Sequence, residues 1–474
     1  MDTNIAYVLM LGTLGFFGYV GYQAATEKEL DQDSYLSARG TQNSLKIGLS
    51  LFASGMGIWI LFGPSEVGYY GGFWDVVGYA LSASTPFLLL AYVGPMVRER
   101  LPNGVTLADY VRMRIGRPMQ IYVGIISVAY MFTFLFAEFT AIGKAMEILG
   151  NMDPLIPMVA VGVVTASYTA YGGLPASLRT DRWQAWVVLW LIVVLLLILF
   201  GGDVGSLISD AKAYNPEDDW SIGSMSYMDS FTSGLALVIA ITAAEMFSQG
   251  NWQRAWASED DEALKKGALL AAGLVLPLVF VMGVLGTVVA GQGAVDDPSA
   301  AFFNLIDDAH VLLIAAFVVL GIALVCSSVD TLQNAVVASI SRDLADGNMD
   351  LKQARIATLT MIPVAIYLAS TMDALSVFAI FLFADLLATA TVLPVFLTLW
   401  DRIDSRAALA GAICGLLSVV VYGTVTADLS TGIDYLTSPT NEYGLANLEV
   451  FLSALIGSGA VTLIGSVAIE NLEK

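Results

Sequence analysis

The sequence predicts an all-α polytopic membrane protein with thirteen transmembrane helices. Of its 474 residues, 57% are hydrophobic and only 13% are charged, whereas soluble domains carry about 25% charged residues. Residues 183–200 contain no charge at all, and a membrane-spanning helix needs roughly 20 mainly apolar residues. Because backbone groups in lipid must be paired internally, helices are the expected spanning form.

The predicted spans follow the apolar runs in chain order, each ending at a polar break. They lie at residues 4–24, 46–63, 70–95, 119–146, 154–171, 181–201, 230–250, 267–291, 311–341, 354–370, 374–400, 405–427 and 447–469. The period-two alternation that marks membrane β-barrels is absent. The first run follows a segment without the positive charge of a secretory signal, so we expect it to be a retained helix.

Lysine and arginine separate strongly between alternate loops. Counting Lys46 at its helix edge, 19 of the 21 lie in 25–45, 96–118, 172–182, 251–266, 342–355, 401–406 and the C-terminal tail. The opposite loops hold only Lys144 and Lys212. Cytoplasmic loops carry such an excess. We therefore expect a plasma-membrane protein with its N-terminus outside, its C-terminus in the cytoplasm and an extracellular loop at 202–229.

The net charge of −21 excludes nucleic acid as a partner, because nucleic-acid binding needs a basic surface. The acids suit either an exposed surface in a salty habitat or a vestibule that concentrates cations. No nucleotide-binding Walker sequence is present. With a single His, and no base beside either Cys326 or Cys414, the chain is not expected to be an enzyme. No obligate protein partner is evident.

The second predicted span is interrupted at its middle by small residues. Ser54, Gly55 and Gly57 lie within KIGLSLFASGMGIWILFGP, and glycine and serine lower helix propensity. A break frees backbone carbonyls, which in transporters coordinate a monovalent cation near the membrane midplane. The alternative is close helix packing through small residues.

A second polar cluster lies within the span 311–341. Ser327, Asp330 and Thr331 share one helix face, with Ser328 beside them. Their oxygen atoms suit Na⁺, although hydroxyls can also bond back to the preceding turn. Asp330 favours function, because a carboxylate inside a span usually pairs or functions. Asp181, at the start of another span, is either a helix cap or a functional group.

Six segments, in the same order along the chain, resemble motifs of the sodium:solute symporter family. They are SYLSARGTQNSLKIGLSLFASGMGIW, LPNGVTLADYVRMRIG, GGLPASLRTDRWQ, WQRAWASEDDEALKKG, SSVDTLQNAVVASISRDL and ALAGAICG. The resemblance implies a LeuT-type core of two inverted five-helix repeats, at 46–201 and 230–400. Residues 1–45 would add an N-terminal helix and a cytoplasmic loop, and 401–474 two peripheral helices.

The resemblance also implies cation sites. The principal Na⁺ site would combine backbone carbonyls with two hydroxyls, from Ala53, Met56, Leu324, Ser327 and Ser328. Some members hold a second cation, for which the matching residues are Asp181, Asp330 and Thr331. Some amino-acid-transporting members carry an aspartate where this chain has Gly55. Its absence argues against a proline transporter and leaves the coupling ion open.

Three carboxylates lie within the spans expected to surround the solute: Glu138, Glu245 and Asp385. An unpaired carboxylate at membrane depth costs at least ~2.5 kcal/mol, and no Lys or Arg lies at matching depth to neutralise all three. We expect at least one to bind an amine or another cationic group. Another could carry H⁺, since burial favours the neutral form; the alternative is a protonated structural residue. Gly55, Gly57 and Trp59 complete the predicted solute site.

The sequence thus predicts a secondary active transporter in a lipid bilayer that couples Na⁺ entry to uptake of a small organic solute. An amine-bearing or zwitterionic solute is the expectation. An H⁺-coupled symporter that uses the intramembrane carboxylates, and a solute sensor that does not transport, are the alternatives.

Overall fold

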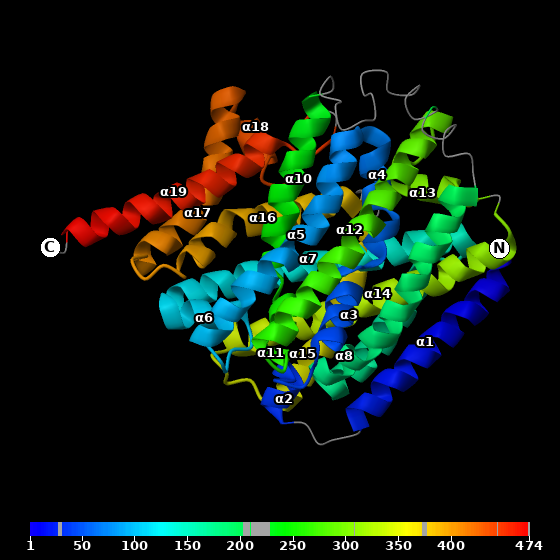
Figure 1. Ribbon diagram of the computed structural model, residues 1–474, viewed down its shortest axis with the longest axis horizontal. Coiled ribbons are helices and arrows are strands. Elements are labelled where there is room, and N and C mark those ends of the chain that lie inside the picture. Colours follow the sequence, from blue (N-terminus) through cyan, green and yellow to red (C-terminus); the bar gives the residue numbers. More distant parts are fainter. Residues whose placement is uncertain are drawn as a thin grey trace.

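The computed structural model describes residues 1–26, 31–201, 209, 228–307, 309–371, 377–442 and 444–472. Over these residues the protein is a bundle of helices, with two isolated β-bridges and no strand (Figure 1). The predicted loop 202–229 lies almost entirely outside the described residues.

In chain order, the helices fall into two halves. The first half comprises α1 (Thr3–Thr26), α2 (Gln32–Ser37), α3 (Ser44–Gly55), η1 (Ile58–Leu61), α4 (Gly63–Tyr70), α5 (Phe73–Arg100), α6 (Leu107–Arg114), α7 (Arg117–Gly150) and α8 (Leu155–Gly201). The second half comprises α10 (Met228–Phe247), α11 (Gln249–Ala257), α12 (Asp261–Gln292), η2 (Pro298–Ala300), α13 (Ala301–Asn304), α14 (Val311–Ser339), η3 (Ile340–Leu344), α15 (Leu351–Thr371), α16 (Val377–Leu397), α17 (Ser405–Thr426), α18 (Leu429–Asp434) and α19 (Leu448–Leu472).

The count of thirteen spans is not confirmed. Within the described residues, 11 helices are long and apolar enough to cross a membrane, or up to 12 if the bent pair formed by Ser44–Gly55 and Ile58–Tyr70 is one span. The predicted spans 154–171 and 181–201 both fall in α8, which is interrupted at Gly173 (φ 55°, ψ −148°). A straight helix of its 47 residues would be about 70 Å long, more than twice the ~30 Å hydrocarbon core. Glycine at 173 allows the interruption, since φ is positive there.

Two helices break in the middle of the protein. The predicted break is present: α3 ends at Gly55, and the following segment turns away by 57°. A second break, at Ser248 between α10 and α11, was not predicted. The predicted cytoplasmic loop 251–266 was therefore wrong at its beginning, because residues 251–257 belong to α11, and every residue of that helix is buried.

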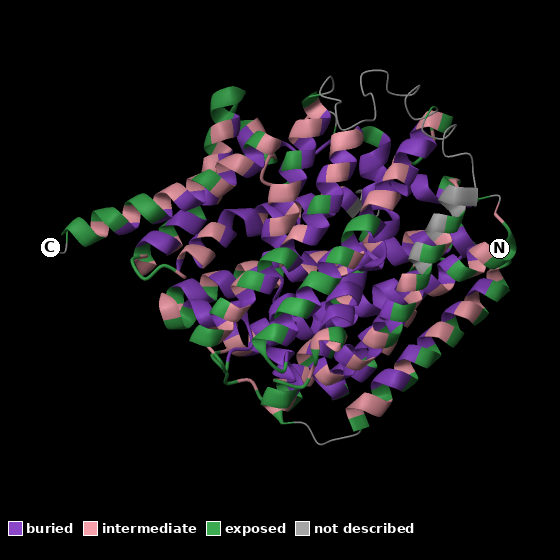
Figure 2. Ribbon diagram, viewed as in Figure 1, coloured by how far each residue is buried: buried purple, intermediate pink, exposed green. Residues whose placement is uncertain are grey.

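The broken helices lie in the centre, and unbroken helices cover them. Helix α1 packs against α8 and α14 at one edge, while α17 and α19 pack against α16 at the other (Figure 1). Buried residues dominate the centre, and the outer helices expose much of their surface (Figure 2). Val8 and Leu11 of α1 and Ile464 and Val467 of α19 are exposed, as expected for helices that face lipid. The repeat boundaries at 46–201 and 230–400 stay a prediction.

Helix α12 approaches α4 closely because both present glycines. A Cβ atom at Gly286 would lie 2.6 Å from the Cα and carbonyl carbon of Ser65, and one at Gly68 would meet the backbone of Gly283. Small residues permit such backbone contact between membrane helices. Gly273 lies on the same helix, α12, but a Cβ atom added there would have no neighbouring atom within 4 Å.

We expect Gly286→Ala to lower the midpoint of thermal unfolding in detergent, because the new methyl group overpacks the contact with Ser65. Overpacking costs typically about 1–3 kcal/mol. Gly273→Ala is the matched control and should leave the midpoint unchanged or raise it, since alanine favours a helix. Equal shifts in the two variants would contradict this account of the packing.

Candidate functional site

Glu138 of α7 holds the first helix break. Its carboxylate accepts hydrogen bonds from the backbone N–H of Ile58 (Oε2, 3.0 Å) and of Trp59 (Oε1, 3.4 Å). These are the first N–H groups of the helix after the break, which have no partner within their own helix. Glu138 is buried. Glu138 therefore supplies hydrogen-bond acceptors for two backbone N–H groups that would otherwise need a water molecule as partner.

The break lies beside the serine pair predicted to bind Na⁺. A Cβ atom at Gly57 would be 2.6 Å from the Oγ of Ser328, and α14 packs against both α3 and η1. Met56 leaves the helical conformation (φ −98°, ψ 81°). The Oγ of Ser327 donates to Asp181 Oδ1 at 2.8 Å.

All five residues of the predicted Na⁺ site are buried: Ala53, Met56, Leu324, Ser327 and Ser328. Their carbonyl and hydroxyl oxygens are the donors that a hard monovalent cation prefers, so the residues present fit sodium. The structure brings the broken helix and the serines of α14 together. Which of these oxygens hold an ion stays a prediction.

The residues predicted for a second cation surround a buried arginine. Arg254 of α11 donates to Asp181 Oδ2 and to Thr331 Oγ1, both at 2.7 Å, and neither Arg254 nor Asp181 exposes any side-chain surface. Its Nε donates to Ser50 Oγ at 2.7 Å, and its Nη1 to the Gly250 carbonyl at 3.0 Å. Guanidinium therefore provides the positive charge beside Asp181 and Thr331.

Asp330, the third member of that set, has donors of its own. Tyr168 and Ser177 donate to it at 2.6 Å, and Thr180 donates at 3.0 Å. Thr331 lies next to it at 3.5 Å. The three residues are thus neighbours, and Thr331 joins the surroundings of Asp181 to those of Asp330. A second cation bound between them stays a prediction.

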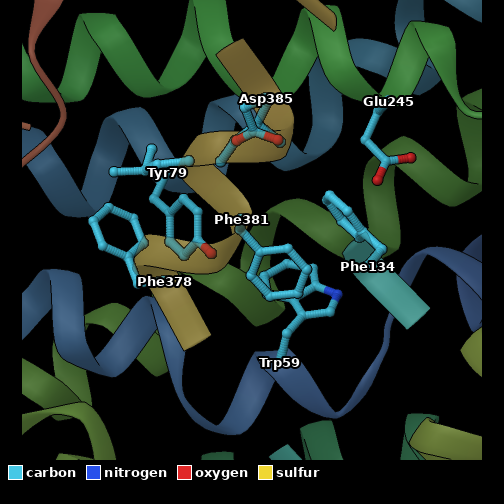
Figure 3. Close-up of a pocket in the computed structure, with 9 residues that line it drawn as sticks. Trp59, Tyr79, Phe134, Glu245, Phe378, Phe381 and Asp385 are labelled. Carbon is cyan, nitrogen blue, oxygen red and sulfur yellow. The ribbon is translucent and has the colours of Figure 1, made fainter. Parts of the chain in front are cut away.

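Two adjoining cavities lie beside the break and share Trp59, Phe134 and Glu245. The first is mainly aromatic (Figure 3) and is lined by Trp59, Tyr79, Phe134, Ile241, Glu245, Phe378, Phe381, Leu382 and Asp385. The second is more polar and is lined by Ser54, Gly55, Trp59, Tyr130, Phe134, Glu138, Glu245, Ser248, Asn251, Ser328, Thr331 and Leu332.

The structure brings the six predicted solute residues together. Gly55 and Glu138 line the polar cavity, Asp385 lines the aromatic one, and Trp59 and Glu245 line both. Gly57 lines neither cavity but abuts Glu138 and Ser328.

Aromatic rings line the same cavity as the carboxyl groups of Asp385 and Glu245 (Figure 3). The ring centroid of Phe381 is 4.3 Å from that of Phe134 and 6.2 Å from that of Trp59. Ring faces attract cations, most strongly where water is excluded. Carboxylates together with such rings form a surface suited to an organic cation.

Two polar groups at the cavities lack a partner. The Oδ1 of Asp385 and the hydroxyl of Tyr130 are buried and make no hydrogen bond with any described residue. An unsatisfied buried group costs about 1–3 kcal/mol, so each is available to a bound molecule. Glu245, by contrast, accepts a hydrogen bond from Asn251 Nδ2 at 2.9 Å.

Sequence reasoning missed the structural role of Arg254, which it counted among the bases of a cytoplasmic loop. Its neighbours were a usable signal, because Trp252 and Trp256 flank it at a spacing of two residues. Large apolar side chains on both sides of an arginine favour burial over a solvated loop. Asn251 and Tyr130 were also missed, and no local pattern marks either residue.

A membrane-spanning bundle in which two interrupted helices meet at buried polar cavities is the architecture of a secondary transporter. Residues 35–415 match the sodium:solute symporter family, and the chain belongs to that family. It is a membrane transporter rather than an enzyme.

The chain is similar to known transporters over most of its length. It is 30% identical to a spermidine transporter of Candida albicans over 89% of this chain and 79% of that protein. It is 23% identical to a sodium/proline symporter of Staphylococcus saprophyticus over 89% of this chain and 86% of that protein. Its fold matches that of a Na⁺-coupled sialic acid symporter, with a TM-score of 0.75, 15% identity and 98% of each chain covered. The predicted LeuT-type fold is confirmed.

We expect Arg254→Met to lower the free energy of unfolding by about 3–5 kcal/mol, because it leaves the buried Asp181 without its partner. The double variant that adds Asp181→Asn should lose much less than the sum of the two single variants. Denaturant or thermal unfolding in detergent measures all three.

The exposed ion pair between Lys266 and Glu262 provides the control. Lys266→Gln should leave unfolding unchanged, because exposed pairs contribute little. Additive effects of Arg254→Met and Asp181→Asn would show that the buried pair is not an energetic unit.

Proposed function

We propose that the protein is a Na⁺-coupled symporter that takes a small, amine-bearing organic solute into the cell. The observation that carries this proposal is a shared cavity wall. Ser328, from the predicted Na⁺ site, and Gly55, from the helix break, line the same cavity as Glu138 and Glu245. An ion and a solute bound there would touch the same residues.

Coupling follows from that shared wall. Na⁺ bound between the break and the serines would hold α3 against α14 and fix the side of the cavity to which Trp59 belongs. Each ligand would then raise the affinity for the other, as linkage requires. With the N-terminus outside, the loaded protein would close, open inward and release Na⁺ into a sodium-poor cytoplasm.

The lining of the cavities supports an amine. Asp385 and Glu245 offer carboxylate oxygens, and the rings of Phe381 and Trp59 offer π faces. The similarity to a spermidine transporter supports the same chemistry, because spermidine carries protonated amino groups separated by apolar methylene chains. The sodium/proline symporter relative supports sodium as the coupling ion.

We expect NaCl to raise the unfolding midpoint of the purified protein above that in KCl at equal ionic strength. A ligand that binds only the folded state at 100 times its Kd adds about 2.7 kcal/mol. Ser328→Ala should abolish the difference, whereas Ser167→Ala, an exposed serine on α8, should keep it. The absence of any difference between the salts would contradict the sodium site and favour proton coupling.

We expect Glu245→Gln to weaken binding of spermidine by roughly tenfold to a hundredfold, because a hydrogen bond to a charged group contributes about 1.5–3 kcal/mol. Titrating spermidine in NaCl and following the unfolding midpoint measures this. Glu147→Gln, an exposed glutamate on α7, is the control. Unchanged affinity and unchanged pH dependence in Glu245→Gln would exclude Glu245 from the solute site.

A further inference from the structure

The N–H groups at the first helix break are already taken by the protein. In transporters with broken helices, such N–H groups point at an anionic group of the solute, because the start of a helix carries partial positive charge. Here Ile58 and Trp59 donate instead to the two oxygens of Glu138, at 3.0 and 3.4 Å. The carboxylate that faces these N–H groups is therefore a side chain of the protein, Glu138 of α7, and not a group of the solute.

The backbone at the break is closely covered, so a second carboxylate could not be carried by the broken helix itself. A Cβ atom at Gly57 would lie 2.6 Å from the carboxyl carbon of Glu138 and 2.6 Å from the Oγ of Ser328. One at Gly55 would lie 2.8 Å from the ring of Phe87. The carboxyl of Glu138 therefore occupies the place in front of the N–H groups of Ile58 and Trp59, whichever charge state it carries.

The electrostatics of the cavities also disfavour an anionic group. The described residues that line them include Glu138, Glu245 and Asp385, but no Lys, Arg or His. Arg254 is already bound to Asp181 and its other partners. A solute carboxylate would meet three acidic side chains and no side-chain cation, whereas an amine would meet acceptors.

An amine, in turn, finds an acceptor without a partner. Asp385 is buried, and its Oδ1 makes no hydrogen bond with any described residue. The aromatic rings beside it offer π faces to the same positive charge.

We propose that Glu138 supplies the carboxylate at the helix break, so that the solute is an organic cation with amino groups and no carboxylate of its own. This inference rests on the proposed function and narrows it. Amino acids, which bring a carboxylate with them, are excluded. Glu138 is then a specificity-determining residue as well as a partner of the broken helix.

Matched pairs of solutes test the inference. Putrescine and ornithine have the same spacing of amino groups and differ by one carboxylate, and agmatine and arginine differ in the same way. In saturating NaCl, each is titrated against the unfolding midpoint of the wild-type protein. We expect the decarboxylated member of at least one pair to bind at least tenfold more tightly. If in neither pair the amine binds more tightly than the amino acid, the inference is overturned.

Two variants then assign the selectivity to Glu138. Glu138→Ala opens the position and frees both N–H groups, so the preference for putrescine over ornithine should fall at least tenfold or reverse. Glu138→Gln fills nearly the same volume and should keep most of the preference. A putrescine-to-ornithine ratio that is the same in wild type and Glu138→Ala would overturn the role of Glu138.

The salt comparison separates this inference from the proposed function. If NaCl stabilises the protein but ornithine binds as well as putrescine, sodium coupling stands and the inference fails. If the two salts act alike but putrescine is still preferred, the inference stands and sodium coupling fails.

Discussion

A helix that breaks inside a membrane exposes backbone groups where no water can pair with them, and side chains close the two breaks beside the cavities, at Gly55 and at Ser248. At the first, Glu138 receives the N–H groups of Ile58 and Trp59. At the second, side chains just beyond the break donate to the last carbonyls of α10: Asn251 to Glu245, Trp252 to Met246 and Gln249 to Phe247. Of the side chains that pair these backbone groups, Glu138 and Asn251 also line the polar cavity, and Gln249 and Trp252 lie next to Asn251 or close to it in the chain.

This arrangement divides the acidic residues of the core into two kinds. Glu138 and Asp181 are committed within the protein, the first to the broken helix and the second to Arg254. Asp385, with a buried oxygen that makes no hydrogen bond with any described residue, is available to a ligand. Glu245 lies between these kinds, because Asn251 contacts one of its oxygens while the side chain lines both cavities. Acidity at membrane depth therefore does not by itself mark a solute ligand.

The parts that sequence predicted are those with a local physical cause. Long apolar runs placed the helices, and Gly55 and Gly57 marked the first break because they weaken a helix. The carboxylates stood out since charge is rare inside spans. The break at Ser248 could not be distinguished from the end of a helix, because polar residues such as Ser248, Gln249 and Asn251 are expected after a helix end as well as at a break. Arg254 and Asp181 are 73 positions apart in the chain. The sequence around one of them therefore gives no information about its pairing with the other.

The Asp181–Arg254 pair also bears on how the protein responds to the membrane potential. A charge that crosses the whole field exchanges about 2.3 kcal/mol with it per 100 mV. Because the two side chains carry opposite charges 2.7 Å apart, they can move together through the field with almost no electrical work. A lone carboxylate at position 181 would instead make any movement of that part of the protein through the field depend on the membrane potential.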